Sequence, residues 1–344
     1  MERLYYLDDN MKKINYILFL LLFVFKLSAQ DDLIVSHSRF MQKSNPSFMG
    51  INNMNKTGVL YNSVGLVSNQ GIESRYFFGS ISFDSDYFSL GVDMYSYTMD
   101  NAGLVYTKPA ISFIYKIQLD NQDFFLPSIT LGMGSSKLDT SKLVFEDQLS
   151  LVSGYLQALS NDPLAPLIGD ANYLDLGASF IIHSDKYLVG FSAQHLNQPN
   201  ISYNKENEEY KMPIRFSLQG GYEFDINPYD QGFLPRYSTL YAFTNISKSA
   251  YSTDIYLSQE LQFGEFSIGL NEIMKSTESF SMLNVGISVA LSYENFEFGT
   301  LYNFPSRKDP AKAYSPSTFE VFLTFDFSPY LRNRRGDYRR LSID

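Results

Sequence analysis

Residues able to act as nucleophiles, bases or metal ligands are sparse in this sequence. Its three histidines, His37, His183 and His195, lie far apart along the chain, and none has the His-Glu-x-x-His spacing of a zinc-binding helix. There is no Gly-x-Ser-x-Gly motif, no phosphate-binding glycine loop and no cysteine. We therefore predict no catalytic residue, no metal site and no cofactor, and expect no enzymatic activity. A Ser–His or carboxylate pair facing each other in the structure would favour an enzyme instead.

The carboxylates follow a more regular pattern along the sequence. Nine of them occupy the polar positions of segments in which apolar and polar residues alternate: Asp93, Asp175, Glu223, Asp225, Asp254, Glu260, Glu297, Glu320 and Asp326. Alternate residues of a strand point to opposite faces, so these carboxylates share the polar face of a sheet. Inside a closed sheet they would line a cation-preferring pore, or form a polar lining partnered by Lys116 and Arg215.

The same alternation predicts the elements that position these residues. About fourteen segments alternate in this way: 58–68, 71–83, 87–98, 104–119, 124–136, 171–182, 187–194, 213–226, 237–247, 250–263, 265–273, 281–293, 295–304 and 317–327. Most are near the length of a tilted membrane strand, and a sheet crosses lipid only when it closes on itself. The predicted fold class is therefore all-β, a transmembrane antiparallel β-barrel of about fourteen strands. A soluble β-sandwich or propeller is the alternative.

The predicted connections fall into two sets. With the mature N-terminus in the periplasm, the periplasmic turns are 84–86, 120–123, 183–186, 227–236, 264–265 and 294–295, and only 227–236 is long. The longer connections fall on the other side, which is the pattern of outer-membrane barrels. The longest of them, 137–170, could fold inward as a plug or outward as a partner surface.

The N-terminus indicates export. Lys12 and Lys13 precede the apolar run 14–25, and a small residue, Ala29, follows it, as in a secretory signal peptide. We predict a signal peptide over 1–29, with Met11 as an alternative start and an uncleaved anchor as the alternative reading. The mature chain then divides into a periplasmic N-terminal segment (30–57), an outer-membrane barrel (58–327) and a basic periplasmic C-terminal tail (328–344).

Composition excludes several classes of protein. The chain has 344 residues, of which 16% are aromatic and 19% charged, and its formal net charge is −10. Low charge with many aromatic residues is unlike a disordered chain, and a net negative charge is unlike a nucleic-acid-binding protein. The tail departs from this acidic balance through Arg332, Arg334, Arg335, Arg339 and Arg340. It is either a docking peptide for an acidic periplasmic partner or a solvated terminus.

Two segments resemble a known family. In 31–52, Arg39-Phe40-Met41 and the run from Asn45-Pro46-Ser47 to Gly50 are similar to the mature N-terminus of the PorP/SprF family of type IX secretion system outer-membrane proteins of Bacteroidota. In 173–200, a predicted hairpin ends in His195-Leu196 and Gln198-Pro199-Asn200, which resembles the central hairpin of that family. The basic tail and the Arg39-Phe40 pair depart from the family pattern.

The resemblance implies a non-catalytic barrel at the cell outer membrane that binds type IX secreted surface proteins, including gliding adhesins, and helps to secrete or anchor them. Its implied partners are outer-membrane lipid, such an adhesin, and periplasmic type IX and gliding components, without nucleic acid. The partner-binding candidates are Arg39, Phe40, Asn45, Pro46, Gly50, His195, Gln198, Pro199 and Asn200, with the five tail arginines. Asn45-Pro46 and Gly50 would form either a turn into the first strand or a periplasmic dock. A diffusion channel or solute transporter is the alternative function.

Overall fold

The computed structural model describes residues 34–53, 55–65, 71–83, 87–120, 122–142, 170–203, 210–229, 233–250, 252–276, 280–306 and 316–327. The predicted signal peptide, most of the loop 137–170 and the basic tail with Arg332, Arg334, Arg335, Arg339 and Arg340 lie outside these residues. Within the described part of the chain, no helix is long and apolar enough to cross a membrane.

The described chain is almost entirely antiparallel sheet. Its strands are β1 (Lys56–Val64), β2 (Ile72–Phe83), β3 (Phe88–Met99), β4 (Leu104–Tyr115), β5 (Ile117–Gln118), β6 (Phe124–Leu138), β7 (Ala171–His183), β8 (Tyr187–Gln194), β9 (Arg215–Asp225), β10 (Thr239–Lys248), β11 (Thr253–Phe263), β12 (Phe266–Ser276), β13 (Phe280–Tyr293), β14 (Phe296–Pro305) and β15 (Thr318–Asp326). Since β4 and β5 both pair with β6 and are separated by Lys116 alone, they occupy one position in the wall. The predicted fourteen-strand barrel is confirmed.

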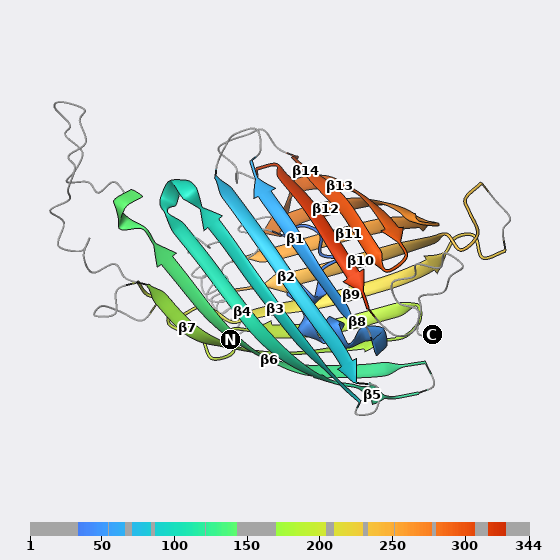
Figure 1. Ribbon diagram of the computed structural model, residues 1–344, viewed down its shortest axis with the longest axis horizontal. Coiled ribbons are helices and arrows are strands. Elements are labelled where there is room, and N and C mark those ends of the chain that lie inside the picture. The colour runs from blue at the N-terminus through green and yellow to red at the C-terminus, as the bar shows by residue number, and fades with distance from the viewer. Residues whose placement is uncertain are drawn as a thin grey trace, which may run out of the picture. The chain divides into compact units, whose positions relative to one another are not determined.

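The sheet closes through its first and last strands. Each strand pairs with its neighbours in sequence, and β1 pairs with β15 from Lys56↔Asp326 to Val64↔Thr318. Figure 1 shows the strands as a tilted ring. Closure leaves no sheet edge along the wall, which is what a lipid environment requires of a β-structure.

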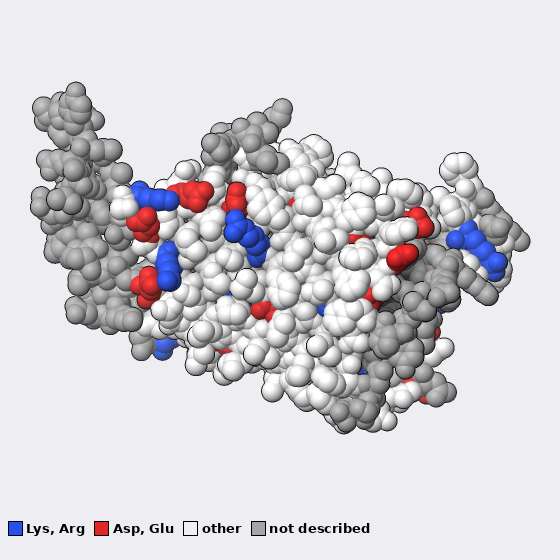
Figure 2. Space-filling view, in the orientation of Figure 1, with Lys and Arg blue, Asp and Glu red and all other residues white. Residues whose placement is uncertain are grey.

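The two faces of the wall differ as predicted. Outward residues such as Ile129, Leu174 and Ile287 are exposed and apolar, and the face seen in Figure 2 is largely uncharged between its ends. Inward residues are mostly small or polar. Six of the nine carboxylates expected inside are buried, namely Asp175, Glu223, Glu260, Glu297, Glu320 and Asp326, and Asp93, Asp225 and Asp254 are half-buried. An apolar outer face with a polar interior is the arrangement of an outer-membrane barrel.

The connections also separate by length. At one end, called here the short-turn end, they are 84–87, 119–123, 184–186, 264–265 and 294–295, with 226–238 as the long exception. At the other, the long-loop end, they include 139–170, 195–214 and 306–317, and two 3-10 turns, η3 (Asp100–Ala102) and η4 (Thr140–Lys142).

The N-terminal segment requires a correction. The sequence predicts a periplasmic segment over 30–57, but residues 34–53 lie inside the barrel, and β1 begins at Lys56. They form two 3-10 helices, η1 (Met41–Lys43) and η2 (Pro46–Asn53), joined by turns (Figure 1). The physical reason is that their backbone and side-chain polar groups find partners on the polar inner wall.

Candidate functional site

The feature that distinguishes this barrel is the segment inside it, residues 34–53, which we call the plug. Of its residues, Ile34, Phe40, Asn45 and Ser47 are almost completely buried. Its contacts reach strands far apart around the wall, from β1 and β15 to β7 and β8. The plug therefore contacts the inner wall at several separate strands rather than following one strand.

The start of the plug is held by Glu320 of β15. Its carboxylate accepts hydrogen bonds from the backbone N–H of Val35 (2.6 Å) and of Ser36 (3.0 Å), and from the Ser36 hydroxyl. Asn62 of β1 donates from its amide at 2.8 Å. One buried carboxylate thus satisfies two backbone donors that would otherwise be unpaired in the barrel interior.

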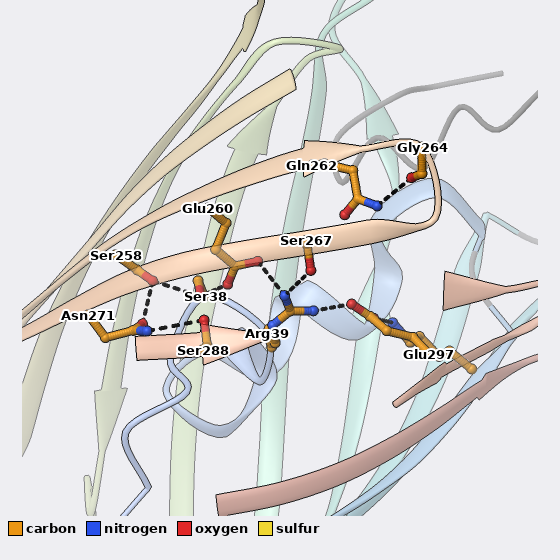
Figure 3. A network of polar contacts seen from close by, with 11 residues as sticks. Ser38, Arg39, Ser258, Glu260, Gln262, Gly264, Ser267, Asn271, Ser288 and Glu297 are labelled. Carbon is orange, nitrogen blue, oxygen red and sulfur yellow. Dashed lines mark hydrogen bonds and ion pairs between the residues drawn. The ribbon is translucent and has the colours of Figure 1, made fainter. Parts of the chain in front are cut away.

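Arg39 holds the plug to three further strands (Figure 3). Its guanidinium pairs with Glu260 of β11 at 3.0 Å and with Glu297 of β14, and it donates to the Ser267 hydroxyl of β12 at 2.7 Å. Ser38 beside it donates to the other oxygen of Glu260. A planar fork of donors can bridge carboxylates on different strands, which a lysine ammonium would do less well.

Phe40 adds apolar packing next to this ion-pair cluster. Its ring meets Tyr76, Phe78 and Phe322 edge-on, at centroid distances of 6.0, 5.9 and 5.7 Å. The Arg39 guanidinium lies 5.0 Å from the centre of the same Phe322 ring. Edge-to-face ring pairs and a cation over a ring each stabilise the fold in addition to the free energy gained by burying their apolar area.

Asn45 and Pro46 turn the chain into η2. The Asn45 side-chain oxygen accepts from the Ser47 N–H at 3.0 Å, and proline, which lacks an N–H, suits a first helical position. The Asn45 amide nitrogen donates to the Phe180 carbonyl at 3.1 Å and to the Gln219 side chain at 3.0 Å. Asn45-Pro46 therefore turns the chain into η2 inside the barrel rather than directly into the first strand, and the Asn45 side chain also binds the wall.

Gly50 lies where the plug comes closest to the wall. A Cβ there would stand 2.8 Å from the Cγ2 atom of Ile114, so the approach requires glycine. Around it the plug residues Phe48, Met49 and Ile51 pack against the wall in one apolar cluster. The cluster contains wall residues Ile114, Leu126, Ile181, Leu188, Tyr241 and Phe243.

The structure thus unites the first five candidates, Arg39, Phe40, Asn45, Pro46 and Gly50, in one plug. Sequence reasoning missed their partners. The alternation placed Glu260, Glu297 and Glu320 on the inner face correctly, but neither of its two readings, a cation-preferring pore or a lining partnered by Lys116 and Arg215, included the plug as their partner. The available signal was Arg39 itself, the first arginine of the mature chain.

The second group of candidates lies at the long-loop end, after β8. His195 has a left-handed backbone (φ +60°) and its Nδ1 lies 2.9 Å from the Asp175 carboxylate, which also pairs with Lys108. Gln198 donates its N–H to the His195 carbonyl, and Pro199 accepts from Met212. Asn200 forms an isolated bridge with Lys211. This segment builds a loop of its own and is not part of the plug.

A small cavity of about 50 Å³ separates the plug from part of the wall. Its lining includes Lys43, Asp93, Lys108 and Asp175, so it is polar and charged. Among the described residues there is no group of three or more acidic or histidine side chains placed to hold a metal ion.

One Ser–His pair of the kind that would favour an enzyme does occur. His37 Nδ1 lies 3.1 Å from the Ser44 hydroxyl, both within the plug. Both residues are buried, the imidazole ring lies 3.8 Å from the Tyr256 ring between centroids and is tilted by 35° to it, and Asn245 donates to the same hydroxyl at 3.2 Å. This environment fixes the plug internally, and neither residue lines the cavity.

Comparison with solved structures finds outer-membrane barrels at low identity. A TodX deltaS2S3 mutant monoaromatic hydrocarbon channel has 11% identity and a TM-score of 0.48, over 83% of this chain and 93% of that one. Omp33 of Acinetobacter baumannii has 9% identity and a TM-score of 0.41, over 80% and 100%. The KdgM porin has 8% identity and a TM-score of 0.37, over 79% and 99%. No curated protein matches the chain.

The family comparison covers the plug and nearly all of the barrel. The model of the type IX secretion system membrane protein PorP/SprF matches residues 28–325. This confirms the family resemblance, and with the lipid-facing closed barrel it places the protein in the outer membrane. The chain belongs to the PorP/SprF family and is an outer-membrane component of the type IX secretion system.

Proposed function

We propose that this barrel acts by binding partners rather than by passing solutes. It would hold type IX secreted surface proteins, such as gliding adhesins, at the outer membrane and help to secrete or anchor them, without catalysis. The observation that carries the proposal is the plug, since Arg39 and Glu320 fix the chain's own N-terminal segment across the lumen. A filled lumen leaves the loops and turns as the surfaces available for function.

The long-loop end is the proposed site for the surface protein. Outer-membrane barrels place long loops outside the cell, and the candidates His195, Gln198, Pro199 and Asn200 lie at this end. His195 and Gln198 both have left-handed backbones, at φ +60° and +44°. That conformation is energetically unfavourable for residues other than glycine, and residues that adopt it concentrate at functional sites.

Periplasmic components of the system are the second proposed class of partner. The N-terminal residues expected to form a dock for them are buried in the lumen, so contact would use the short turns and the basic tail. The tail follows β15 in the sequence, and β15 ends at the short-turn end, because its last residue, Asp326, pairs with Lys56, the first residue of β1.

The proposal is tested by purifying the protein from native outer membranes and recording its conductance in planar bilayers. We expect a surface protein with a type IX sorting domain to co-purify and the intact barrel to conduct little. A barrel that purifies alone and conducts ions would support the diffusion channel instead. The polar cavity beside the plug favours that alternative, because it has room for a few water molecules.

The Arg39→Ala variant shows whether the conductance test responds to the plug. Removing the guanidinium leaves Glu260 and Glu297 without the cation that they share, which should loosen the plug and raise the conductance. If the variant and the intact protein conduct equally well, the plug does not close the lumen, and the argument from it fails.

A further inference from the structure

The ribbon formed by β6 and β7 continues past the closed wall at the long-loop end. The strand β7 pairs with β6 as far as Ala171, but its pairing with β8 ends at Ala178, and β8 itself ends at Gln194. Residues 172–176 of β7 therefore have a strand on one side only. We call their open side the β7 edge, and such an edge needs an explanation because it offers unpaired backbone groups.

The hydrogen bonds show which residues of β7 face the open side. Leu196 donates its N–H to the Leu176 carbonyl at 2.9 Å, and the Leu176 N–H donates to the Asn197 side-chain oxygen at 3.0 Å. The Asn197 amide nitrogen donates to the Leu174 carbonyl at 2.7 Å. Leu176 and Leu174 thus face the open side, and since backbone groups alternate along a strand, Asn172 does too. One asparagine side chain stands here in the place of a strand.

Three backbone groups of the β7 edge remain unpaired. Within the described part of the chain, neither the Leu174 N–H nor the N–H and carbonyl of Asn172 has a hydrogen-bond partner. Unpaired donors and acceptors in an extended row are a template to which another chain can add a strand.

The loop after β8 turns toward the lumen instead of following the β7 edge. Beyond Asn197 the chain forms a narrow arm in which Asn200 bridges Lys211. The Tyr203 hydroxyl of this arm lies 2.5 Å from the hydroxyl of Ser136, a buried residue on the inner face of β6. The described residues of the arm therefore cross the luminal side of the ribbon and leave Asn172 and its neighbours exposed on the outer side.

The outer face beside the β7 edge is apolar. Leu174 and Leu176 point outward at 59% and 45% exposure, and Met133, the cross-strand partner of Leu174, is 57% exposed. An exposed ion pair, Lys137 with Asp170 at 3.7 Å, marks the end of this apolar surface. Unpaired backbone groups are unfavourable beside an apolar, lipid-facing surface, so a strand added at this level would be stabilised.

The residues that cap the β7 edge sit in a strained loop. His195 and Gln198, on either side of Leu196 and Asn197, have positive φ angles of 60° and 44°. The Asp175 carboxylate, 2.9 Å from His195 Nδ1, holds the first of them. An added strand would satisfy both backbone groups of each residue that faces the open side, which the cap does only for Leu176. The cap is therefore replaceable by a strand.

We propose that the β7 edge accepts an extended segment of the secreted surface protein as an added strand. The segment displaces the Asn197 side chain, pairs with Asn172, Leu174 and Leu176, and presents an apolar residue outward at every second position. The open groups are backbone groups beside an uncharged surface, which an extended apolar peptide complements. The edge also lies at the end that outer-membrane barrels place outside the cell. The inference rests on the function proposed above and gives the surface protein its place of attachment.

A proline variant tests the hydrogen bonds of the added strand. Leu174→Pro removes an N–H that points away from β6, so the ladder between β6 and β7 keeps its bonds, and proline is tolerated at such edge positions. We expect the amount of surface protein retained after washing of the purified complex to fall about tenfold or more. Leu174→Ala keeps the N–H and should lose much less. If Leu174→Pro unfolds in urea like the intact protein and retains as much surface protein, the β7 edge is not the place of attachment.

Removing the cap should have the opposite effect, and this test does not depend on the proline variant. Asn197→Ala deletes two hydrogen bonds that an incoming strand has to break. Retention of the surface protein should therefore rise about threefold or more. A role for Asn197 in shaping a binding loop would lower retention instead. Retention that falls or stays the same overturns the proposal.

Crosslinking identifies the occupant and separates this proposal from the function on which it rests. A photo-crosslinking amino acid replaces the exposed Asn172, or, as a control, the outward Ile287 of β13. Illumination of native outer membranes should join position 172, but not position 287, to a surface protein with a type IX sorting domain. Crosslinks from position 172 only to lipid, to a second copy or within the chain overturn the proposal. If the surface protein co-purifies without this crosslink, the proposed function stands and the β7 edge is excluded. If no surface protein co-purifies with the intact barrel, the proposed function itself fails.

Discussion

The two halves of the plug are held by different chemistry. The first half, 34–40, meets carboxylates: Glu320 takes the backbone of Val35 and Ser36, and Arg39 bridges Glu260 and Glu297. The second half, 45–51, meets amides, hydroxyls and apolar side chains on the opposite part of the wall. Charge requires exact partners in a dry interior, whereas apolar packing tolerates alternatives. The first half therefore fixes where the plug sits, and the second half fills the space.

The largest effect is expected from removing the cation of the first half. Arg39→Ala leaves two buried carboxylates without their shared partner, which costs about 3–5 kcal/mol when a buried pair is broken. The measurement is urea unfolding of the refolded barrel in detergent, together with its conductance.

A compensated variant tests whether uncompensated charge is the reason. Combining Arg39→Met with Glu260→Gln and Glu297→Gln removes all three charges and should recover most of the stability, because buried ion pairs are often replaceable by neutral groups. If the triple variant is as unstable as Arg39→Ala, packing rather than charge explains the loss, and the contrast between the halves disappears.

The next effect is expected at Glu320. Glu320→Gln replaces one acceptor oxygen by an NH₂ group, which then faces either the donors Val35 N and Asn62 Nδ2 or the N–H and hydroxyl of Ser36. Losing hydrogen bonds to a charged acceptor costs about 1.5–3 kcal/mol in the free energy of unfolding. Glu272→Gln in β12, where the carboxylate is half-buried on the outward-facing side of the strand, is the control outside the lumen and should change little. Equal losses would show that the luminal position of Glu320 does not decide its contribution.

In the second half a steric change is expected to cost less than loss of the cation. Gly50→Ala places a Cβ 2.8 Å from Ile114 Cγ2, an overpacking worth about 1–3 kcal/mol. Ile114→Leu removes that methyl group and should recover part of the loss in the double variant. Gly79→Ala is the control, because its Cβ would meet nothing closer than 3.7 Å. If Gly50→Ala leaves the free energy of unfolding unchanged, the plug backbone can shift at this position to make room for the methyl group.

The sequence predicted the wall much better than the plug, for a physical reason. Strand alternation is local, so β13 and β15 could be predicted within one residue of their ends, and the inward face of Glu260 was predicted with them. The plug has no period, and its contacts join residues far apart, such as Val35 and Glu320. Asn45, Pro46 and Gly50 could be recognised as a turn, but nothing local showed that this turn lies inside the barrel. Alternation predicts which face of the sheet a carboxylate occupies, but it does not predict which residue the carboxylate binds.

The smallest effect is expected outside the lumen, at the exposed pair of Arg75 and Glu73 on β2. Their atoms lie 3.3 Å apart, as close as many buried pairs, but the two side chains are 66% and 37% exposed. Water and salt screen such a pair, so Arg75→Ala should change the free energy of unfolding by less than about 1 kcal/mol. The half-buried luminal pair of Lys275 and Asp254 is the intermediate case, with 17% exposure on each side, and Lys275→Ala should fall between Arg75→Ala and Arg39→Ala. If the three variants lose stability in any other order, burial does not decide what a charge contributes here, and the distinction between the charged and neutral halves of the plug would have to rest on geometry alone.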